Sequence, residues 1–135
     1  MDAMPIDWDE LRRRARDMAG RAYAPYSGVR VGAAGISADG RIVEGCNVEN
    51  ASMGIGICAE VNLAGQLVAS GGGRLVALAV VAGDGEPIAP CGRCRQFLYE
   101  FGGDSLLLDW TDGPLTLGAL LPHAFGPADV DERAG

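Results

Sequence analysis

The order of apolar segments along the chain predicts an α/β protein, a three-layer α/β/α sandwich in which helices cover both faces of a mixed β-sheet. Segments with helical spacing of apolar residues alternate with strand-like segments, in the order helix, strand, strand, helix, strand, helix, strand. The chain has 135 residues and no internal repeat or low-complexity tract. This length suits one domain with a sizeable core, so we expect residues 1–135 to form a single domain.

The first half of the chain predicts a helix followed by a β-hairpin and a polar loop. In order, these elements are a helix from Asp7 or Asp9 to Ala22, strands at 29–37 and 41–48, and a loop at 49–56. Pro25 ends the helix, because a proline disfavours helical geometry in the residue before it. The Asp39-Gly40 pair predicts the tight turn of the hairpin.

The second half predicts two more helices and at least two more strands. In order, these are a helix at 57–70, a strand at 74–82, a helix from Cys91 or Gly92 to Phe101, a strand at 105–110, and a short strand or helix at 114–121. The continuous apolar run at 74–82 is typical of a buried parallel strand. The tail after Phe125 is polar.

Charge and hydropathy exclude several classes of partner. The chain carries 18 acidic and 11 basic residues, a net charge of −7, and it has no basic stripe that could bind a nucleic-acid backbone. No apolar run approaches the ~20 residues of a membrane span, and the N-terminus lacks the pattern of a signal peptide. We therefore expect a cytoplasmic protein without a nucleic-acid or membrane partner, whose four cysteines are metal ligands or buried thiols rather than disulfides.

Two fragments carry the strongest functional signal, Cys58-Ala59-Glu60 and Pro90-Cys91-Gly92-Arg93-Cys94. Three thiolates can hold one Zn²⁺ and leave its fourth position open for water, which is typical of a catalytic site. The pattern is similar to the three-cysteine signature of zinc deaminases, in which the Glu transfers protons and is not a ligand. The sequence thus predicts one zinc per chain on Cys58, Cys91 and Cys94, with Glu60 as the catalytic residue.

Both cysteine fragments fall where a helix should begin. Free backbone N–H groups and the positive end of the helix dipole favour the thiolate form there. Two other interpretations are a closed structural zinc site that also uses Cys46, and four thiols that are merely buried. We expect Cys46 to be a small core residue and the single histidine, His123, to lie at the surface.

The chain resembles the small zinc-dependent cytidine deaminases over nearly its whole length. Besides the zinc fragments, the resemblance is carried by Ala24-Pro25-Tyr26-Ser27, Val31-Gly32-Ala33-Ala34 and Asn47-Val48-Glu49-Asn50-Ala51-Ser52. It implies a five-stranded sheet flanked by helices and hydrolytic deamination of cytidine or deoxycytidine, a small-molecule substrate. It also implies a homotetramer, with a dimer as the alternative, whose active sites are completed by neighbouring chains.

The resemblance also assigns residues to the substrate pocket. Asn47 and Glu49 would hydrogen-bond the ribose hydroxyls, and Ala59 would contact the pyrimidine edge together with Glu60. Phe125 is similar to an aromatic residue that enters a neighbour's pocket; simple core packing is the alternative for this side chain.

Three positions depart from the family pattern. Val29 stands where an aromatic residue packs on the base, Met53 where Tyr is common, and Val61 where many members have an Arg that hydrogen-bonds the zinc thiolates. Arg93 is a candidate to replace that Arg.

The wider base pocket suggests a second hypothesis, a modified or bulkier cytosine nucleoside as substrate. Blasticidin S deaminase resembles this chain at residues 90–96 but lacks the loop that begins at Asn47. A hypothesis of another class is a non-catalytic, zinc-stabilised binding module, which would have no use for Glu60.

Overall fold

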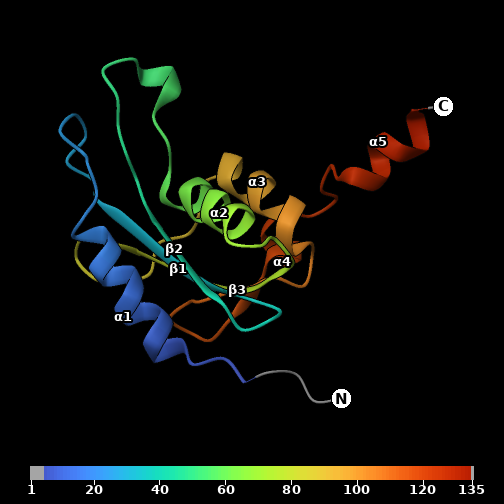
Figure 1. Ribbon diagram of the computed structural model, residues 1–135, viewed down its shortest axis with the longest axis horizontal. Coiled ribbons are helices and arrows are strands. Elements are labelled where there is room, and N and C mark those ends of the chain that lie inside the picture. The colour runs from blue at the N-terminus through green and yellow to red at the C-terminus, as the bar shows by residue number, and fades with distance from the viewer. Residues whose placement is uncertain (1–4, 135) are drawn as a thin grey trace.

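A five-stranded sheet lies between two layers of helices in the computed structural model, which describes residues 5–134. In chain order the elements are α1 (Trp8–Ala19), β1 (Val31–Ser37), β2 (Ile42–Cys46), the short 3₁₀ helix η1 (Met53–Ile55), α2 (Ala59–Ala69), β3 (Leu75–Ala82), α3 (Gly92–Gly102), β4 (Leu107–Leu108), β5 (Leu115–Thr116), α4 (Leu117–Leu120) and α5 (Pro127–Arg133). Helix α1 covers one face of the sheet, and α2 and α3 cover the other (Figure 1). The predicted three-layer α/β/α sandwich is confirmed.

The strand order is β2-β1-β3-β4-β5, and the sheet is mixed. The β1–β2, β1–β3 and β4–β5 pairs are antiparallel, and only the β3–β4 pair is parallel. The prediction of a parallel strand at 74–82 is therefore correct for one edge of β3 and wrong for the other. The apolar run reflects burial on both faces of this central strand, which helices cover on each side.

Small residues bring α1 close to its face of the sheet. Ala15 and Ala19 of α1 pack on Ala34, Ala77, Ala79 and Val81 of the strands. At Gly32 of β1, an added Cβ would lie 1.9 Å from the carbonyl oxygen of Ala15. Helix and strand are in backbone contact here, and no larger residue fits.

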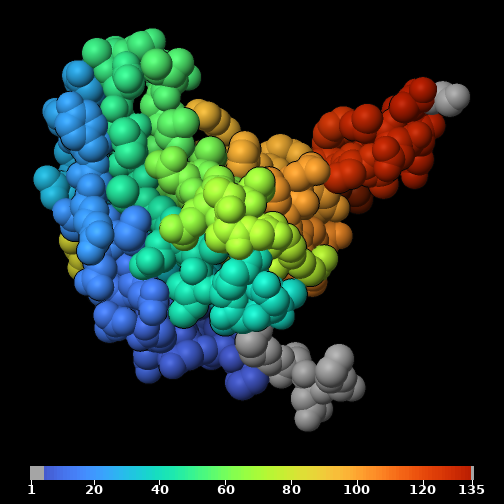
Figure 2. All heavy atoms as spheres, viewed as in Figure 1, coloured from blue at the N-terminus to red at the C-terminus, as the bar shows by residue number. Residues whose placement is uncertain are grey.

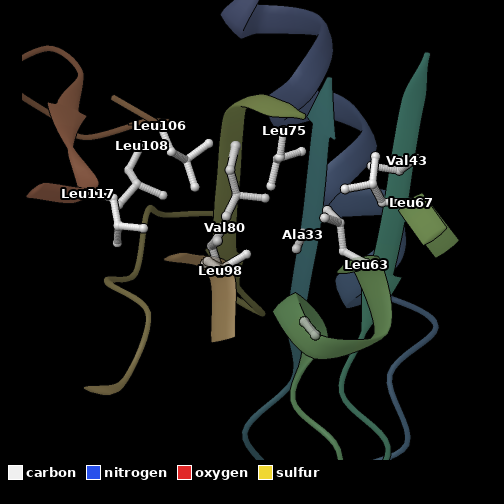
Figure 3. Close-up of a cluster of buried hydrophobic side chains, with 12 residues drawn as sticks. Ala33, Val43, Leu63, Leu67, Leu75, Val80, Leu98, Leu106, Leu108 and Leu117 are labelled. Atoms are coloured by element: carbon white, nitrogen blue, oxygen red, sulfur yellow. The ribbon is translucent and has the colours of Figure 1, made fainter. Parts of the chain in front are cut away.

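Leucines fill the opposite face, between the sheet and helices α2, α3 and α4. Figure 3 shows Leu63 and Leu67 of α2 with Val43 of β2, and Leu98 of α3 with Val80 of β3. Gly45 of β2 marks the closest approach, since a Cβ there would lie 2.3 Å from the carbonyl oxygen of Ala59. The first turn of α2 is thereby held directly against the sheet.

Several element boundaries differ from the prediction because long-range hydrogen bonds compete for the same backbone groups. Helix α1 starts after its predicted cap Asp7, whose carboxylate accepts from the amide of Glu10 at 3.1 Å, but it ends at Ala19, not Ala22. The amide of Tyr23 instead donates to the carbonyl of Asn47 at 3.0 Å. Strand β2 ends at Cys46, not residue 48, because the Val48 amide and carbonyl bond Ile57 at 2.9 Å each.

The C-terminal third also departs from the prediction. The strand expected at 105–110 is only two residues long, and the carboxylate of Asp109 after it accepts two hydrogen bonds from the Arg12 guanidinium, at 2.6 and 2.8 Å. The segment 114–121 forms both a short strand, β5, and a short helix, α4.

The polar tail contains a helix that the sequence pattern did not indicate. Pro127 begins α5, and the Asp129 carboxylate accepts from the amide of Gly126 at 2.8 Å. None of its residues is buried, and α5 stands away from the rest of the molecule (Figures 1 and 2). Within residues 5–134, no helix is long and apolar enough to cross a membrane.

Candidate active site and metal centre

Two helix starts bring three cysteines together. Cys58 is the N-cap of α2, Cys91 is the N-cap of α3, and Cys94 lies in the first turn of α3. Their sulfur atoms all lie within 4.8 Å of one another. Tetrahedral zinc with Zn–S bonds of ~2.3 Å needs sulfur atoms about 3.8 Å apart, so the donor set fits one zinc ion.

The three thiols differ in the direction in which the protein shifts their pKa values. Backbone N–H groups of Cys94 and Arg93, at the start of α3, lower the pKa of Cys91, which is exposed. Burial raises the pKa of Cys58, and it raises that of Cys94 strongly. A bound cation would favour the thiolate form of these two cysteines, because metal ligation requires a deprotonated thiol.

Cys46 and His123 take no part in this cluster. Cys46 is outside the metal-ligand group that the described residues form, so the four-cysteine structural site is not what the chain builds. It is also only partly buried, not a core residue as predicted, because it ends β2 at the rim of the sheet. His123 is exposed, as predicted, in a turn with φ of 54°.

Glu60 lies beside the cysteines in the first turn of α2. Its side chain faces a cavity of about 220 Å³ that the three cysteines also line, and the residue is only 4% exposed. Burial raises the pKa of its carboxyl group. A carboxyl with a raised pKa can accept and return a proton near neutral pH.

The same cavity contains most of the residues predicted to bind substrate. Its walls are formed by Ser27, Val29, Val31, Asn47, Glu49, Cys58, Ala59, Glu60, Ile88, Ala89, Cys91 and Cys94. Four of the six predicted substrate residues are present, namely Val29, Asn47, Glu49 and Ala59. Ser27 was missed as an individual residue, although it belongs to the quoted segment 24–27; Ile88 and Ala89 carry no sequence signal beyond their position just before Pro90.

Asn47 and Glu49 build the wall of the cavity with their own side chains. Asn47 accepts from the amide of Val31 at 2.8 Å and donates to the carbonyl of Val29 at 2.9 Å. Glu49 accepts from the Ser27 hydroxyl and from the amides of Tyr26 and Ser27, at 2.9 and 3.1 Å. The hydroxyl and the amides lower the pKa of Glu49. A carboxylate offers about four acceptor sites, so Glu49 retains capacity for a ligand.

Met53 and Phe125 lie outside this cavity. Met53 is 77% exposed and lines a neighbouring hollow with Tyr26 and Glu49. Phe125 is 61% exposed and lies at a groove between α3 and α5, so the interpretation of Phe125 as a core residue is wrong. The Arg93 side chain makes no hydrogen bond to a thiol within residues 5–134; only its backbone N–H reaches Cys91.

A second cavity, of about 190 Å³, shares Ile88 and Ala89 with the first. Its lining is almost wholly apolar, and its one carboxylate, Asp109, is already bonded to Arg12. The second cavity therefore offers no charged side chain that is free of a partner in its own lining.

Comparison with known proteins decides the family. Residues 7–108 match the family described as "Cytidine and deoxycytidylate deaminase zinc-binding region". The chain belongs to this family. The cytidine deaminase of Mycobacterium tuberculosis strain H37Rv is 53% identical over 125 residues, covering 93% of this chain and 94% of that protein. The cytidine deaminase of Sporosarcina psychrophila is 37% identical over 134 residues, covering 96% and 98%.

Solved structures agree with the fold. The crystal structure of cytidine deaminase from Mycobacterium tuberculosis aligns with a TM-score of 0.89 at 53% identity, covering 90% of this chain and 99% of that one. That from Mycobacterium leprae aligns with a TM-score of 0.85 at 48% identity, covering 88% and 100%. The family resemblance seen in the sequence is thus confirmed, together with the mixed five-stranded sheet. The zinc-binding region that the family description names agrees with the cluster of Cys58, Cys91 and Cys94.

Proposed function

We propose that this chain is a zinc-dependent hydrolase that converts cytidine or deoxycytidine and water to uridine or deoxyuridine and ammonia. The observation that carries the proposal is the buried Glu60 carboxyl, which shares one cavity with three clustered thiols. A purely structural zinc site has no use for such a carboxyl group. The relatives named cytidine deaminase support the same activity. We propose that residues 1–135 act as one domain in this reaction.

In this proposal the chain's own residues bind the metal and move the protons. Cys58, Cys91 and Cys94 would hold the zinc ion, which would act as a Lewis acid and lower the pKa of water. A carboxylate oxygen of Glu60 accepts one proton from the attacking water and delivers it to N3 of the pyrimidine, while the water oxygen bonds to C4. Glu60 then transfers the second proton of that water to the amino group, the C4–N bond breaks, and ammonia leaves. Glu60 is only 4% exposed, so the fold itself limits the access of bulk water to this carboxyl group.

The sugar lies at the other end of the cavity in this proposal. The Glu49 carboxylate accepts hydrogen bonds from the ribose hydroxyls, and the Asn47 amide accepts from or donates to them, using the capacity that their contacts to backbone leave free. Ala59 contacts the pyrimidine edge from the start of α2. Val29, which is 52% exposed, covers the base with less surface than an aromatic ring and leaves room for a bulkier cytosine nucleoside as the second candidate substrate.

We also propose that the chain assembles as a homotetramer, with a dimer as the alternative. Large apolar side chains are exposed on the neighbouring segments that contain Tyr23, Val48 and Ile57. Val48 forms β-bridges to both Tyr23 and Ile57. Such patches are typical of interfaces. Phe125, exposed and outside its own chain's cavity, would enter a neighbour's pocket, and Met53 would face the same interface. The four free thiols suit the cytoplasmic location that the sequence predicts.

The test of the proposed activity is ammonia release and loss of cytosine absorbance by the purified, zinc-loaded protein. Cytidine, deoxycytidine and blasticidin S are compared as substrates under the same conditions. Rapid turnover of cytidine or deoxycytidine supports the proposal, and turnover of blasticidin S alone supports the bulkier substrate. One bound zinc without turnover of any of the three supports the binding module instead.

A further inference from the structure

Arg95, directly after the last of the three clustered cysteines, links the loop before α3 to the end of α4. It lies in the first turn of α3 and is partly buried. Its Nε donates to the carbonyl of Pro90 at 2.8 Å, and its Nη1 donates to the carbonyl of Leu120 at 2.9 Å. Since a guanidinium presents its donors in a rigid fork, the two carbonyl groups are held in a fixed relation.

Two further residues of α3, Gln96 and Tyr99, also contact the part of the chain that follows α4. Gln96 donates from Nε2 to the carbonyl of Phe125 at 2.6 Å. Gly126 lies so close to Tyr99 that a Cβ would come within 2.6 Å of the ring. Three side chains of the metal-binding helix thus contact residues 120–126, the connection between α4 and α5, which we term the C-terminal segment.

From this juxtaposition we propose that Arg95 is a positioning residue for Cys91, and that Arg95 and Gln96 couple metal binding to the order of the C-terminal segment. The proposal rests on the proposed metal-binding role of the three cysteines. Pro90 immediately precedes Cys91, so fixing the Pro90 carbonyl fixes the backbone that carries this thiol. Groups that orient metal ligands in this way commonly change metal affinity when they are replaced.

The coupling works in both directions. A metal ion shared by Cys91 and Cys94 fixes the start of α3, and with it the side chains at 95 and 96 that hold the C-terminal segment. Free-energy coupling between two sites is reciprocal, so metal binding orders the segment to the extent that an ordered segment favours metal binding. The Phe125 side chain is 61% exposed, so at this position the hydrogen bond from Gln96 to the backbone contributes more to the order than apolar burial does.

The test combines zinc affinity with hydrogen–deuterium exchange. We expect Arg95→Met to weaken zinc binding about 10- to 100-fold, measured by competition with a chromogenic chelator. In the unmodified protein, we expect peptides from residues 118–134 to exchange faster once zinc is removed. In Arg95→Met their exchange is fast with or without zinc.

Matched variants separate the two parts of the proposal. Gln96→Leu removes only the bond to Phe125, so we expect faster exchange of residues 118–134 and a smaller loss of zinc affinity than in Arg95→Met, which also frees the Pro90 carbonyl. Arg21→Met is the control for loss of an arginine; Arg21 is exposed, and its side chain makes no hydrogen bond within residues 5–134. Neither zinc affinity nor exchange should change in this control.

Two outcomes would overturn the proposal. One is a lower melting temperature of Arg95→Met with unchanged zinc affinity, which would make Arg95 a purely structural residue. The other is C-terminal exchange in the unmodified protein that does not respond to zinc. If Arg95→Met does not fold, Arg95→Lys replaces it, and an intermediate loss of affinity is expected because one ammonium group cannot reproduce the fork. An unmodified protein that binds no zinc would instead reject the metal site itself.

Discussion

Two carboxylates line the same cavity, and the protein shifts their pKa values in opposite directions. Glu60 is buried, and burial raises its pKa. Glu49 accepts a hydroxyl and two amide hydrogen bonds, which lower its pKa. Environments that separate two titratable groups in this way mark different roles. The first group is suited to exchanging a proton, and the second is suited to remaining charged and accepting hydrogen bonds.

The two ends of the cavity are also built differently. The metal half, which consists of Cys58, Glu60, Cys91 and Cys94, lies on the starts of two helices packed on the sheet. The other end, which we call the sugar half because Asn47 and Glu49 are proposed to bind the ribose, consists of Ser27, Asn47 and Glu49 and lies on irregular segments held by bonds from side chain to backbone. We therefore expect changes in the metal half to affect the chemical step, and changes in the sugar half to affect binding.

The largest effect is expected from removing a metal ligand. Cys94→Ala should abolish both zinc binding and cytidine turnover, because Cys94 is a buried member of the thiol cluster. Zinc content by atomic absorption and the rate of absorbance loss measure the two effects. Cys46→Ala is the control and should keep one zinc per chain; a Cys94→Ala protein that also keeps one zinc would contradict the assignment.

A smaller loss is expected from removing the proton carrier. Glu60→Gln should lower kcat by about 10²- to 10⁴-fold, because a carboxamide can act neither as a base nor as an acid near neutral pH, while zinc content stays the same. Steady-state kinetics with cytidine measure the change. Glu100→Gln, at an exposed position on α3, is the control. A kcat close to that of the unmodified enzyme would remove Glu60 from the mechanism.

Changing Glu49 should affect substrate binding more than the chemical step. Glu49→Gln loses the charge that accepts from the Ser27 hydroxyl and the Tyr26 amide. We expect KM for cytidine to rise about 10- to 100-fold, the effect of losing a charge-assisted hydrogen bond, with a much smaller change in kcat. A variant with a lower kcat and an unchanged KM would contradict the assignment of Glu49 to substrate binding.

The smallest effect concerns the pH dependence of the sugar half. Because the pKa of Glu49 is lowered in the folded chain, its contribution to the order of residues 24–29 is present above the ordinary pKa of Glu. That contribution is lost as the pH falls through the lowered value. Ser27→Ala removes the main cause of the shift, so we expect the loss to begin at a higher pH.

Hydrogen exchange of the 24–29 backbone at a series of pH values measures this change. Ser52→Ala, in the exposed loop before η1, is a suitable control because its hydroxyl makes no hydrogen bond within residues 5–134. Identical pH profiles for Ser27→Ala and the unmodified protein would show that the hydroxyl does not set the charge state of Glu49.

The metal half was predictable from sequence because its signals are local. Cys58 and Glu60 are two residues apart, Cys91 and Cys94 three, and each pair falls at a helix start. The sugar half was predictable only through the family resemblance. The partners of Glu49 lie 22 and 23 residues away in sequence, and no periodicity encodes such contacts.

Element boundaries were missed for the same reason. Pro25 was expected to end the first helix, but the helix ends before it because the Tyr23 amide donates to the Asn47 carbonyl and not to a helical carbonyl. The helix α5 escaped notice because it has no buried face, and hydrophobic periodicity detects only helices that pack on something. The bonds of Arg95 to Leu120 and of Arg12 to Asp109 span 25 and 97 residues and could not be foreseen.

The contact of Gly45 with the backbone of α2 has a consequence for changing the range of nucleosides that this protein accepts. Any side chain at position 45 would displace the first turn of α2 and move Cys58 and Glu60 together, so a metal-binding cysteine and the proposed proton carrier would shift as one block. Val29 lies on an exposed segment outside that block. Libraries that vary position 29 and keep glycine at 45 can reshape the base pocket while leaving the reactive groups in place.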